Sequence, residues 1–301
     1  MTAAAGHPIA YLILAHGRAE GAAELSRLLA SADPTGTVVV HFDLASDEDQ
    51  WRALRLATQG CDRIRLVEAR RHSAWGSFGI VAATLAGLRL LRDAPVAFDH
   101  VQLLSASCMP LRPLSDLRHH LAAAADTDFI EVRDARWIRD GLRTERYRHR
   151  FPFNYLSQHR RFGVAEAVQA LLGVRRTPPC GLGIAFGSQW WCLSRRTCLA
   201  ILDFLDARPE IERFFASTWI PDEMFFQSLA GRLAAPGVIA DRSLTLYDFD
   251  ANGVAVIFGD GDEARLAASR DHFFARKIDP AAGALRRRLS RRAHGEACPD
   301  Q

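Results

Sequence analysis

The sequence has no marked excess of either charge and contains only one lysine. Lys and Arg together number 38 and Asp and Glu number 35, so the formal net charge is +3. Because domains that bind nucleic acids usually carry a clear basic excess, this near balance argues against a dedicated nucleic-acid binder. Lys277 is the single lysine, so arginine supplies nearly all of the positive charge.

Cysteine motifs and long apolar runs are also missing. None of the six cysteines stands in a C-x-x-C pair, which argues against a zinc or redox motif of that spacing and favours free thiols. The apolar run Ile9–Ala15 is far shorter than the roughly 20 residues of a membrane-spanning helix, and no secretory leader pattern precedes it. We therefore expect a cytoplasmic protein without a transmembrane segment, whose basic C-terminus offers a peripheral contact with the inner face of a membrane.

What the sequence does contain is a regular alternation of strand and helix patterns. Hydrophobic residues make up 49% and charged residues 24% of the chain, as in an ordinary globular protein. Continuous apolar runs predict buried strands of a parallel sheet, and apolar residues at helical spacing predict helices between them. The expected strands cover residues 9–15, 37–43, 63–67 and 101–104, and the expected helices cover residues 21–30 and 77–92.

This alternation predicts a doubly wound α/β fold with a mostly parallel sheet flanked by helices. We expect one compact domain at residues 1–280, followed by a basic helix and tail at residues 281–301. His16, Asp43 and Ser105 each follow a predicted strand. Because ligands bind beyond the carboxyl ends of parallel strands, these three residues are candidates for one shared site.

The second half of the chain has weaker patterns. Residues 126–131 and 244–257 have the apolar content or alternation of strands, and residues 259–262 predict a hairpin turn. Further helices are expected at residues 165–172, 196–207, 210–217 and 223–233, the last of them starting at Pro221-Asp222-Glu223. No internal repeat or low-complexity linker divides this region.

Glu223 is the leading candidate for a catalytic base. Acids after a proline are also what an ordinary helix N-terminus looks like, so on the local pattern alone helix capping is the favoured interpretation. Trp219 and Trp190 add aromatic faces of the kind that bind carbohydrate. A carboxylate beside such a platform is the group that an acceptor hydroxyl needs for deprotonation.

Arg276 and Lys277 are adjacent cations in an aromatic segment. They suit a diphosphate, with arginine as a planar fork and lysine as a point charge, although a solvated pair near the chain end is the simpler interpretation. Hard divalent cations prefer carboxylate ligands, yet residues 104–110, after the strand at 101–104, contain no acid. Asp260-Gly261-Asp262 has a suitable spacing but lies in a late turn. The sequence therefore favours side-chain cations in place of a metal.

Residues 133–161 are crowded with arginine and aromatic side chains. They suit an acidic or sugar acceptor, a single-stranded RNA or a solvated loop, and the balanced net charge counts against RNA. Nucleophilic catalysis is poorly supported, because Gly187-Ser188-Gln189 does not continue as a G-x-S-x-G elbow.

Taken in order, the motifs resemble those of the core-2/I-branching β-1,6-N-acetylglucosaminyltransferases, a family that also includes the peptide O-xylosyltransferases. The resemblance extends from Tyr11 to Asp279. Each motif is weak alone, and the ordered series carries the resemblance. The matching motifs are Ala10-Tyr11-Leu12-Ile13-Leu14-Ala15-His16, Val40-His41-Phe42-Asp43, Trp75-Gly76-Ser77-Phe78, Leu103-Leu104-Ser105-Ala106-Ser107, Gly187-Ser188-Gln189-Trp190-Trp191, Pro221-Asp222-Glu223 and Phe274-Ala275-Arg276-Lys277.

The resemblance implies a GT-A-type, Rossmann-like fold and an inverting transfer from a UDP-sugar without a metal or other cofactor. It assigns Glu223 as the catalytic base and Lys277, with Arg276, as the group on the donor diphosphate. The full set of expected donor-binding residues is His16, Asp43, Trp75, Gly76, Ser105, Arg276 and Lys277. The expected acceptor- and sugar-binding residues are Glu131, Arg143, Arg146, Gln189, Trp190, Trp219 and Asp222.

Two departures from the family pattern stand out. Cys108 occupies a position where many members have Asp, and residues 244–257 lack the additional diphosphate-binding Arg of many members. Animal members of the family are membrane-anchored, and no anchor pattern is seen in this sequence. The chain therefore resembles a bacterial branch of the family, expected to act on a surface polysaccharide. N-acetylglucosamine is the first expectation for the transferred sugar. UDP-xylose as donor, or a catalytically silent glycan-binding protein of the same fold, are the alternatives; the acceptor, linkage and oligomeric state are not predicted.

Overall fold

The computed structural model describes residues 6–138, 146–151, 155–251 and 253–296, and for residues 155–162 it describes the backbone alone. Within these ranges no helix combines the length and the apolar character that crossing a membrane requires. The five described cysteines are free thiols, as expected, and Cys298 lies outside the described residues.

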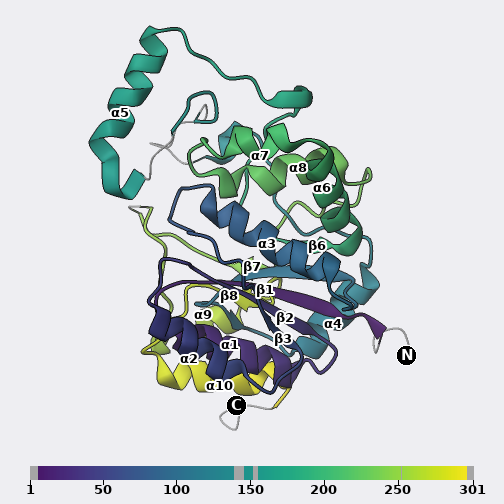
Figure 1. Ribbon diagram of the computed structural model, residues 1–301. Helices are drawn as coiled ribbons and strands as arrows, with labels where there is room; N and C mark the ends of the chain where they lie inside the picture. The colour runs from purple at the N-terminus through teal and green to yellow at the C-terminus, as the bar shows by residue number, and fades with distance from the viewer. Residues whose placement is uncertain (1–5, 139–145, 152–154, 252, 297–301) are drawn as a thin grey trace.

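A five-stranded sheet forms the centre of the molecule (Figure 1). Its strands are β1 (Ile9–Ala15), β2 (Thr37–Phe42), β3 (Ile64–Leu66), β4 (His100–Ser105) and β6 (Cys192–Ser194), in the order β3-β2-β1-β4-β6. The first four strands are parallel and β6 is antiparallel to β4. The expectation of a mostly parallel sheet flanked by helices is confirmed.

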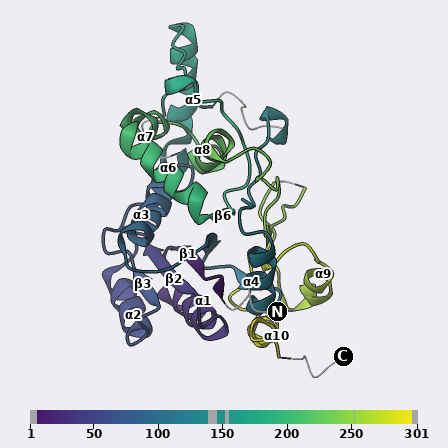
Figure 2. The same cartoon turned by 90° about the vertical axis from the view of Figure 1, so that its right-hand side faces the viewer.

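Both faces of the sheet are covered because successive side chains of a strand point to opposite sides. Leu12 and Val39 pack on one face with α3 (Gly79–Asp93), α6 (Arg195–Ala207) and α8 (Phe225–Leu233). Tyr11 and Val40 pack on the other face with α1 (Ala19–Ala32) and α4 (Leu114–Ala123). Helix α2 (Glu48–Thr58), which the sequence patterns did not single out, packs against α1. Figure 2 shows the two helical layers on either side of the strands.

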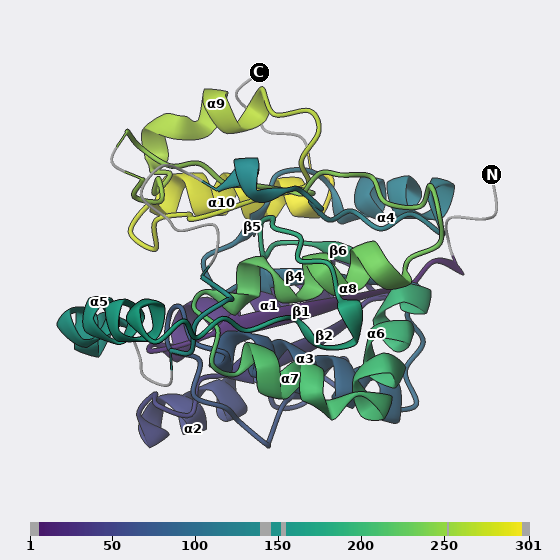
Figure 3. The same ribbon diagram turned by 90° about the horizontal axis from the view of Figure 1, so that it is seen from above.

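A second, three-stranded sheet follows the order β5-β8-β7 and consists of two-residue strands. These are β5 (Met109–Pro110), β8 (Phe274–Ala275) and β7 (Thr245–Leu246). Helix α10 (Gly283–Ala293) contacts β5 and α1, and α9 (Glu263–Ala267) lies nearby (Figure 3). The C-terminal helix is thus part of the packed body.

Several expectations for the second half are wrong. Residues 126–131 form no named strand and make only isolated bridges, at Asp128 and Phe129. Of the described residues between 244 and 257, only the two residues of β7 lie in a strand. The predicted hairpin at 259–262 is a 3-10 turn, Asp260–Asp262, that leads into α9.

Two further helices of the second half agree with the sequence predictions. Helices α6 and α7 (Pro209–Phe215) agree with the expected helices at 196–207 and 210–217. Helix α5 (Tyr155–Leu171) projects from the rest of the molecule, at the top in Figures 1 and 2 and at the left in Figure 3. Single 3-10 turns occur at Ala135–Trp137, Pro179–Gly181 and Pro221–Glu223.

Candidate functional site

The carboxyl ends of three neighbouring parallel strands place the first group of predicted residues. Ala15 of β1 pairs with Phe42 of β2, and Leu14 pairs with Ser105 of β4. His16 and Asp43 therefore follow adjacent strand ends, next to Ser105. The expectation that these three residues share one edge of the sheet is confirmed.

Asp43 is buried and fastens a distant loop to this edge. Its Oδ2 accepts hydrogen bonds from the Ser73 hydroxyl at 2.7 Å and the Ser73 amide at 3.1 Å, and its Oδ1 accepts one from the Ala45 amide at 2.7 Å. Burial alone would raise the pKa of Asp43, but these hydrogen bonds lower it below the ordinary value. Asp43 thus stays ionised and holds the loop that carries Trp75 and Gly76.

That loop reaches the segment before the predicted base. The Gly76 carbonyl accepts a hydrogen bond from the Ile220 amide at 3.0 Å. Gly76 has a φ of +72°, and a Cβ added there would lie 3.4 Å from Nε1 of Trp219. Trp75 is 47% exposed. The structure therefore brings the Trp75-Gly76 segment next to Trp219, although more than 140 residues separate the two in the sequence.

Glu223 does not lie in the first turn of a long helix, so that part of the sequence prediction is wrong. Pro221–Glu223 form a separate 3-10 turn, and α8 begins only at Phe225. Ile220, directly before the turn, has a φ of +48°, which is a strained conformation for a β-branched residue. Such a strained residue persists only where surrounding contacts hold it in place, and strained residues of this kind cluster at functional sites.

Arg146 is the ion-pair partner of Glu223. Its Nη2 donates a hydrogen bond to Oε2 of Glu223 at 2.7 Å. The Arg146 side chain is 0% exposed, whereas 27% of the Glu223 side chain is exposed. The buried Arg146 guanidinium thus holds the Glu223 carboxylate, which stays partly exposed to solvent. Arg143, the other arginine predicted here, lies outside the described residues.

Asp222 is buried next to this pair. Burial and the neighbouring charge of Glu223 raise the pKa of Asp222 to about 7, against the opposing effect of Arg146. Its Oδ1 has no hydrogen-bond partner among the described residues. Asp222 is therefore largely protonated below neutral pH, which leaves Glu223 as the main negative charge beside Arg146.

The segment from Gly187 to Trp190 connects Glu223 to further predicted residues. The Gly187 amide donates to the Glu223 carbonyl at 3.1 Å, and the Ser188 amide donates to Oε2 of Glu131 at 3.0 Å. A Cβ on Gly187 would lie 2.2 Å from the Glu131 carbonyl oxygen, so only glycine fits this approach. Gln189, partly buried, lies between Ser188 and Trp190.

Two residues that the sequence did not single out hold this segment. The buried Gln227 donates from Nε2 to the carbonyls of Gly187 at 3.1 Å and Ser188 at 2.9 Å. Tyr247 donates to both carboxylate oxygens of Glu131, at 2.9 and 3.1 Å. Burial and Glu131 raise the pKa of Tyr247 well above its ordinary value, so its hydroxyl stays protonated. No local motif marks either residue, because the partners that it holds in this segment lie 39 to 116 residues away.

Arg276 and Lys277 stand at the other end of the same segment. The Arg276 guanidinium lies 4.2 Å from the centroid of the Trp190 ring, a cation–π contact. Burial lowers the pKa of Arg276, and burial and Arg276 lower the pKa of Lys277. Among the described residues no carboxylate forms an ion pair with either cation. A site with two unneutralised cations suits an anion.

Cys108 lies beneath this basic pair. It is fully buried, and its Sγ lies 3.3 Å from both the amide and the hydroxyl of Ser105. The Ser107 carbonyl accepts from the amide of Ile278, directly after Lys277. A thiol therefore fills the place of the carboxylate expected from the family pattern, and no acid lies there to neutralise Arg276.

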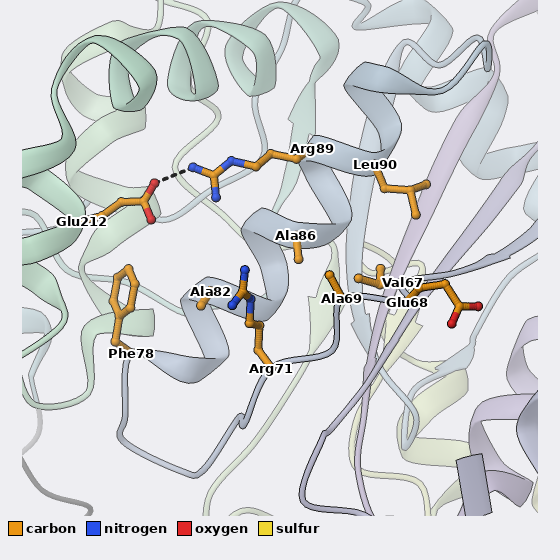
Figure 4. A pocket seen from close by; sticks show the side chains of 10 residues that line it. All are labelled: Val67, Glu68, Ala69, Arg71, Phe78, Ala82, Ala86, Arg89, Leu90 and Glu212. Atoms are coloured by element: carbon orange, nitrogen blue, oxygen red, sulfur yellow. Dashed lines mark hydrogen bonds and ion pairs between the residues drawn. The ribbon is translucent and has the colours of Figure 1, made fainter. Parts of the chain in front are cut away.

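A separate cavity of about 470 Å³ opens at the edge of the main sheet, beside α3. Its wall includes Arg71, Phe78, and the ion pair of Arg89 with Glu212 at 2.5 Å (Figure 4). None of the predicted catalytic, donor or acceptor residues lines it. The ring of Phe78 lies 5.9 Å from that of Phe225, and the Arg71 carbonyl accepts a hydrogen bond from the amide of Leu44, next to Asp43.

The described residues contain no group of three or more His, Cys, Asp or Glu side chains arranged to hold a metal ion.

Comparison with known proteins gives an independent view of the chain. A family model described as Core-2/I-Branching enzyme matches residues 9–264. Xylosyltransferase 2 of Homo sapiens is 26% identical over 249 residues, which cover 80% of this chain and 26% of that protein. Xylosyltransferase 1 of Canis lupus familiaris is 25% identical over 249 residues, 80% of this chain and 24% of that protein. The chain thus spans about a quarter of the length of these relatives.

Among solved structures, the galactosyltransferase LgtC in complex with donor and acceptor sugar analogues is 12% identical with a TM-score of 0.41, covering 97% of this chain and 98% of that one.

Proposed function

The chain belongs to the Core-2/I-Branching enzyme family, and on that premise we propose that it is an inverting, metal-independent glycosyltransferase with Glu223 as its base. It transfers a sugar, with N-acetylglucosamine as the first candidate, from a UDP-sugar to a hydroxyl of a glycan acceptor. The broader class, a glycosyltransferase, is that of the family and of the xylosyltransferase relatives. A bacterial role in surface polysaccharide synthesis and a cytoplasmic location stay predictions.

One observation carries this proposal: a continuous chain of contacts joins a partly open carboxylate to a pair of unneutralised cations. Gly187 bonds to the backbone of Glu223, and the Ser188 hydroxyl accepts from the Trp190 amide at 3.3 Å. The Trp190 ring then supports the Arg276 guanidinium. A base for the acceptor and a cationic site for the departing diphosphate are the two groups that an inverting sugar transfer needs.

The roles of these groups follow from their chemistry. Glu223 takes the proton of the acceptor hydroxyl while that oxygen attacks the anomeric carbon opposite the leaving group. The bond from the anomeric carbon to UDP breaks, and the negative charge that grows on the diphosphate is stabilised by Arg276 and Lys277. Because the Arg276 guanidinium is already held against the Trp190 ring, little reorganisation of that cation is needed during the reaction.

Asp43 acts in this scheme through the loop that it fastens. Both of its carboxylate oxygens are engaged by Ser73 and Ala45, so it sets the position of Trp75 and Gly76 beside the donor. Glu131, Tyr247 and the open side of Glu223 form the wall offered to the acceptor. The names of the relatives support a second candidate, the transfer of xylose from UDP-xylose.

A donor screen with two variants tests the proposal. Purified protein is incubated with UDP-N-acetylglucosamine, UDP-xylose and other UDP-sugars, and the UDP released with and without glycan acceptors is measured. We expect E223Q to lower turnover by roughly 10²- to 10⁴-fold, as loss of a general base does, while UDP binding is kept. K277A should weaken binding of UDP more than binding of uridine, because the lost contact is to the diphosphate.

The contrary results are equally clear. Near-normal turnover of E223Q would refute the base assignment, and equal losses of UDP and uridine binding by K277A would refute the diphosphate role. Activity that vanishes in EDTA and returns with Mn²⁺ would contradict metal independence. UDP-sugar binding without transfer to any acceptor, unchanged in E223Q, would favour the silent glycan-binding alternative.

A further inference from the structure

An unusual surface lies on α5 and the residues after it, which project from the body of the molecule (Figure 1). From residue 163 to residue 175 every exposed residue except Arg175 is glycine, alanine, valine or leucine. The larger ones are strongly exposed: Val164 64%, Val168 47%, Leu171 87% and Leu172 69%. Val164, Val168 and Leu171 lie along one side of α5, at spacings of four and three residues, and Leu172 directly follows the helix.

The polar side chains of the same stretch are turned toward the protein. Glu166 is buried, with an exposed fraction of 7%, and lies 3.9 Å from Nδ1 of His149. Gln169 accepts from the Arg150 amide at 2.8 Å and donates to the Arg150 carbonyl at 3.0 Å. An ordinary surface helix has the opposite arrangement, with its apolar side facing the core. The apolar side of α5 therefore requires a partner that is itself apolar.

The segment is firmly attached to the body at its base. Arg176 donates to the His149 carbonyl at 2.8 Å, and its guanidinium lies 4.1 Å from the centroid of the Phe214 ring. The Phe151 amide donates to the Ser217 carbonyl at 2.7 Å. Helix α5 thus projects from a fixed base, as Figures 1 and 2 show, where it can reach a flat surface without obstruction from the sheet.

Charge identifies the kind of surface. Among the side chains described between 146 and 176, the exposed charged groups are Arg150 and Arg175, whereas the single acid, Glu166, is buried. Apolar residues flanked by arginine suit the boundary between the acyl chains and the headgroups of an anionic membrane. A symmetric contact with a second copy would instead bring the same cations of two chains toward each other.

The basic C-terminal helix is a weaker candidate for such a contact. Four of its arginines are engaged within the chain: Arg286 with Glu24, Arg288 and Arg292 with Glu263, and Arg291 with Glu296. Much of its positive charge is therefore neutralised.

We propose that α5 and the residues up to Arg175 form an interfacial membrane-binding element that inserts Val164, Val168, Leu171 and Leu172 into an anionic lipid surface. This inference does not depend on which sugar the protein transfers, or on whether it transfers one. It places the attachment in the part of the chain that follows Arg146, the partner of Glu223.

Co-sedimentation with lipid vesicles tests the proposal. The full chain is mixed with vesicles of phosphatidylcholine alone or with added phosphatidylglycerol. We expect binding to the anionic vesicles, and the double variant L171Q/L172Q should bind them at least roughly tenfold more weakly, because several methylene groups no longer enter the apolar phase. The matched control is L56Q, at a leucine on α2 that is 74% exposed; it should bind as the unchanged protein does.

Three results would overturn the proposal. The first is no binding of the unchanged protein to anionic vesicles. The second is equal binding by L171Q/L172Q. The third is a dimer in sedimentation analysis that L171Q/L172Q converts to a monomer, which would assign the apolar side to a second copy. Thermal melting of each variant shows whether it is folded, and since both leucines are exposed we expect melting temperatures close to that of the unchanged protein.

Discussion

At the scale of single residues, the pair of Glu223 and Arg146 defines what the candidate base can do. Removing one partner of a buried pair is costly because it leaves the other charge unpaired. Arg146 has no exposed surface, so its charge is balanced mainly inside the protein. Arg146 lies 77 residues before Glu223 in the sequence, and its guanidinium holds one carboxylate oxygen of Glu223 by a hydrogen bond. We therefore regard Arg146 as a positioning residue.

This role predicts the behaviour of two substitutions. R146M should lower kcat by roughly tenfold to a hundredfold, because a displaced base loses its alignment with the acceptor hydroxyl. R146K keeps the charge and should restore part of the loss. UDP affinity, measured by calorimetry, should change little in either variant. A purely structural role would appear instead as equal losses in R146K and R146M together with weaker UDP binding.

Asp222 predicts a pH dependence of stability. Its pKa is raised from the ordinary 3.8 to about 7, so the folded state holds a proton that the unfolded state releases at lower pH. The resulting stabilisation is complete below pH 3.8 and is lost as the pH rises toward 7. Asn does not titrate, so the stability of D222N relative to the unchanged protein should be greater at pH 8 than at pH 5, by about 2–3 kcal/mol. Urea unfolding at both pH values measures this gain, and a constant difference would disprove the assignment.

At the scale of elements, sequence patterns predicted what local physics determines. The apolar runs of β1, β2 and β4 mark strands buried on both faces, and their shared edge followed from parallel packing. The break between Glu223 and α8 was not predictable, because the positive φ of Ile220 is held by a hydrogen bond to Gly76, far away in the chain. The strands of the second sheet have only two residues each, too few for a pattern. Beyond that shared edge, the grouping of the other motifs was predicted only through the family resemblance.

The approach of two segments at Gly187 can be tested directly. Its φ is not positive, so an alanine there is opposed by space alone, since the added Cβ would lie 2.2 Å from the Glu131 backbone oxygen. We expect G187A to destabilise the fold by about 1–3 kcal/mol and to lower turnover, because Gly187 also bonds to Glu223. G183A is the matched control, since nothing lies within 4 Å of its added Cβ.

Urea unfolding and steady-state kinetics of both glycine variants decide the matter. G183A should remain within about 0.5 kcal/mol of the unchanged protein. If G187A were as stable and as active as G183A, the close contact between the two segments would not exist in solution.

At the scale of the whole molecule, the C-terminal helix supports the cationic end of the site. Leu285 and Leu289 of α10 pack in one buried cluster with Ala275 and Ile278, which flank Arg276 and Lys277. The glutamate end of the site rests on a different cluster, which contains Met224 and Phe225. A loss of packing at α10 should therefore disturb Arg276 and Lys277 more than it disturbs Glu223.

The final prediction concerns Leu285, which is fully buried. L285A should lower the free energy of unfolding by about 2–5 kcal/mol, as large-to-small changes in a packed interior do. R287A, at an exposed arginine of the same helix, should have almost no effect. Because the cluster around Leu285 holds the segment that carries Lys277, L285A should also weaken UDP binding while R146K and R146M do not. Unchanged UDP affinity in a destabilised L285A protein would show that the cationic pair is held without α10, and that the site is supported from the central sheet alone.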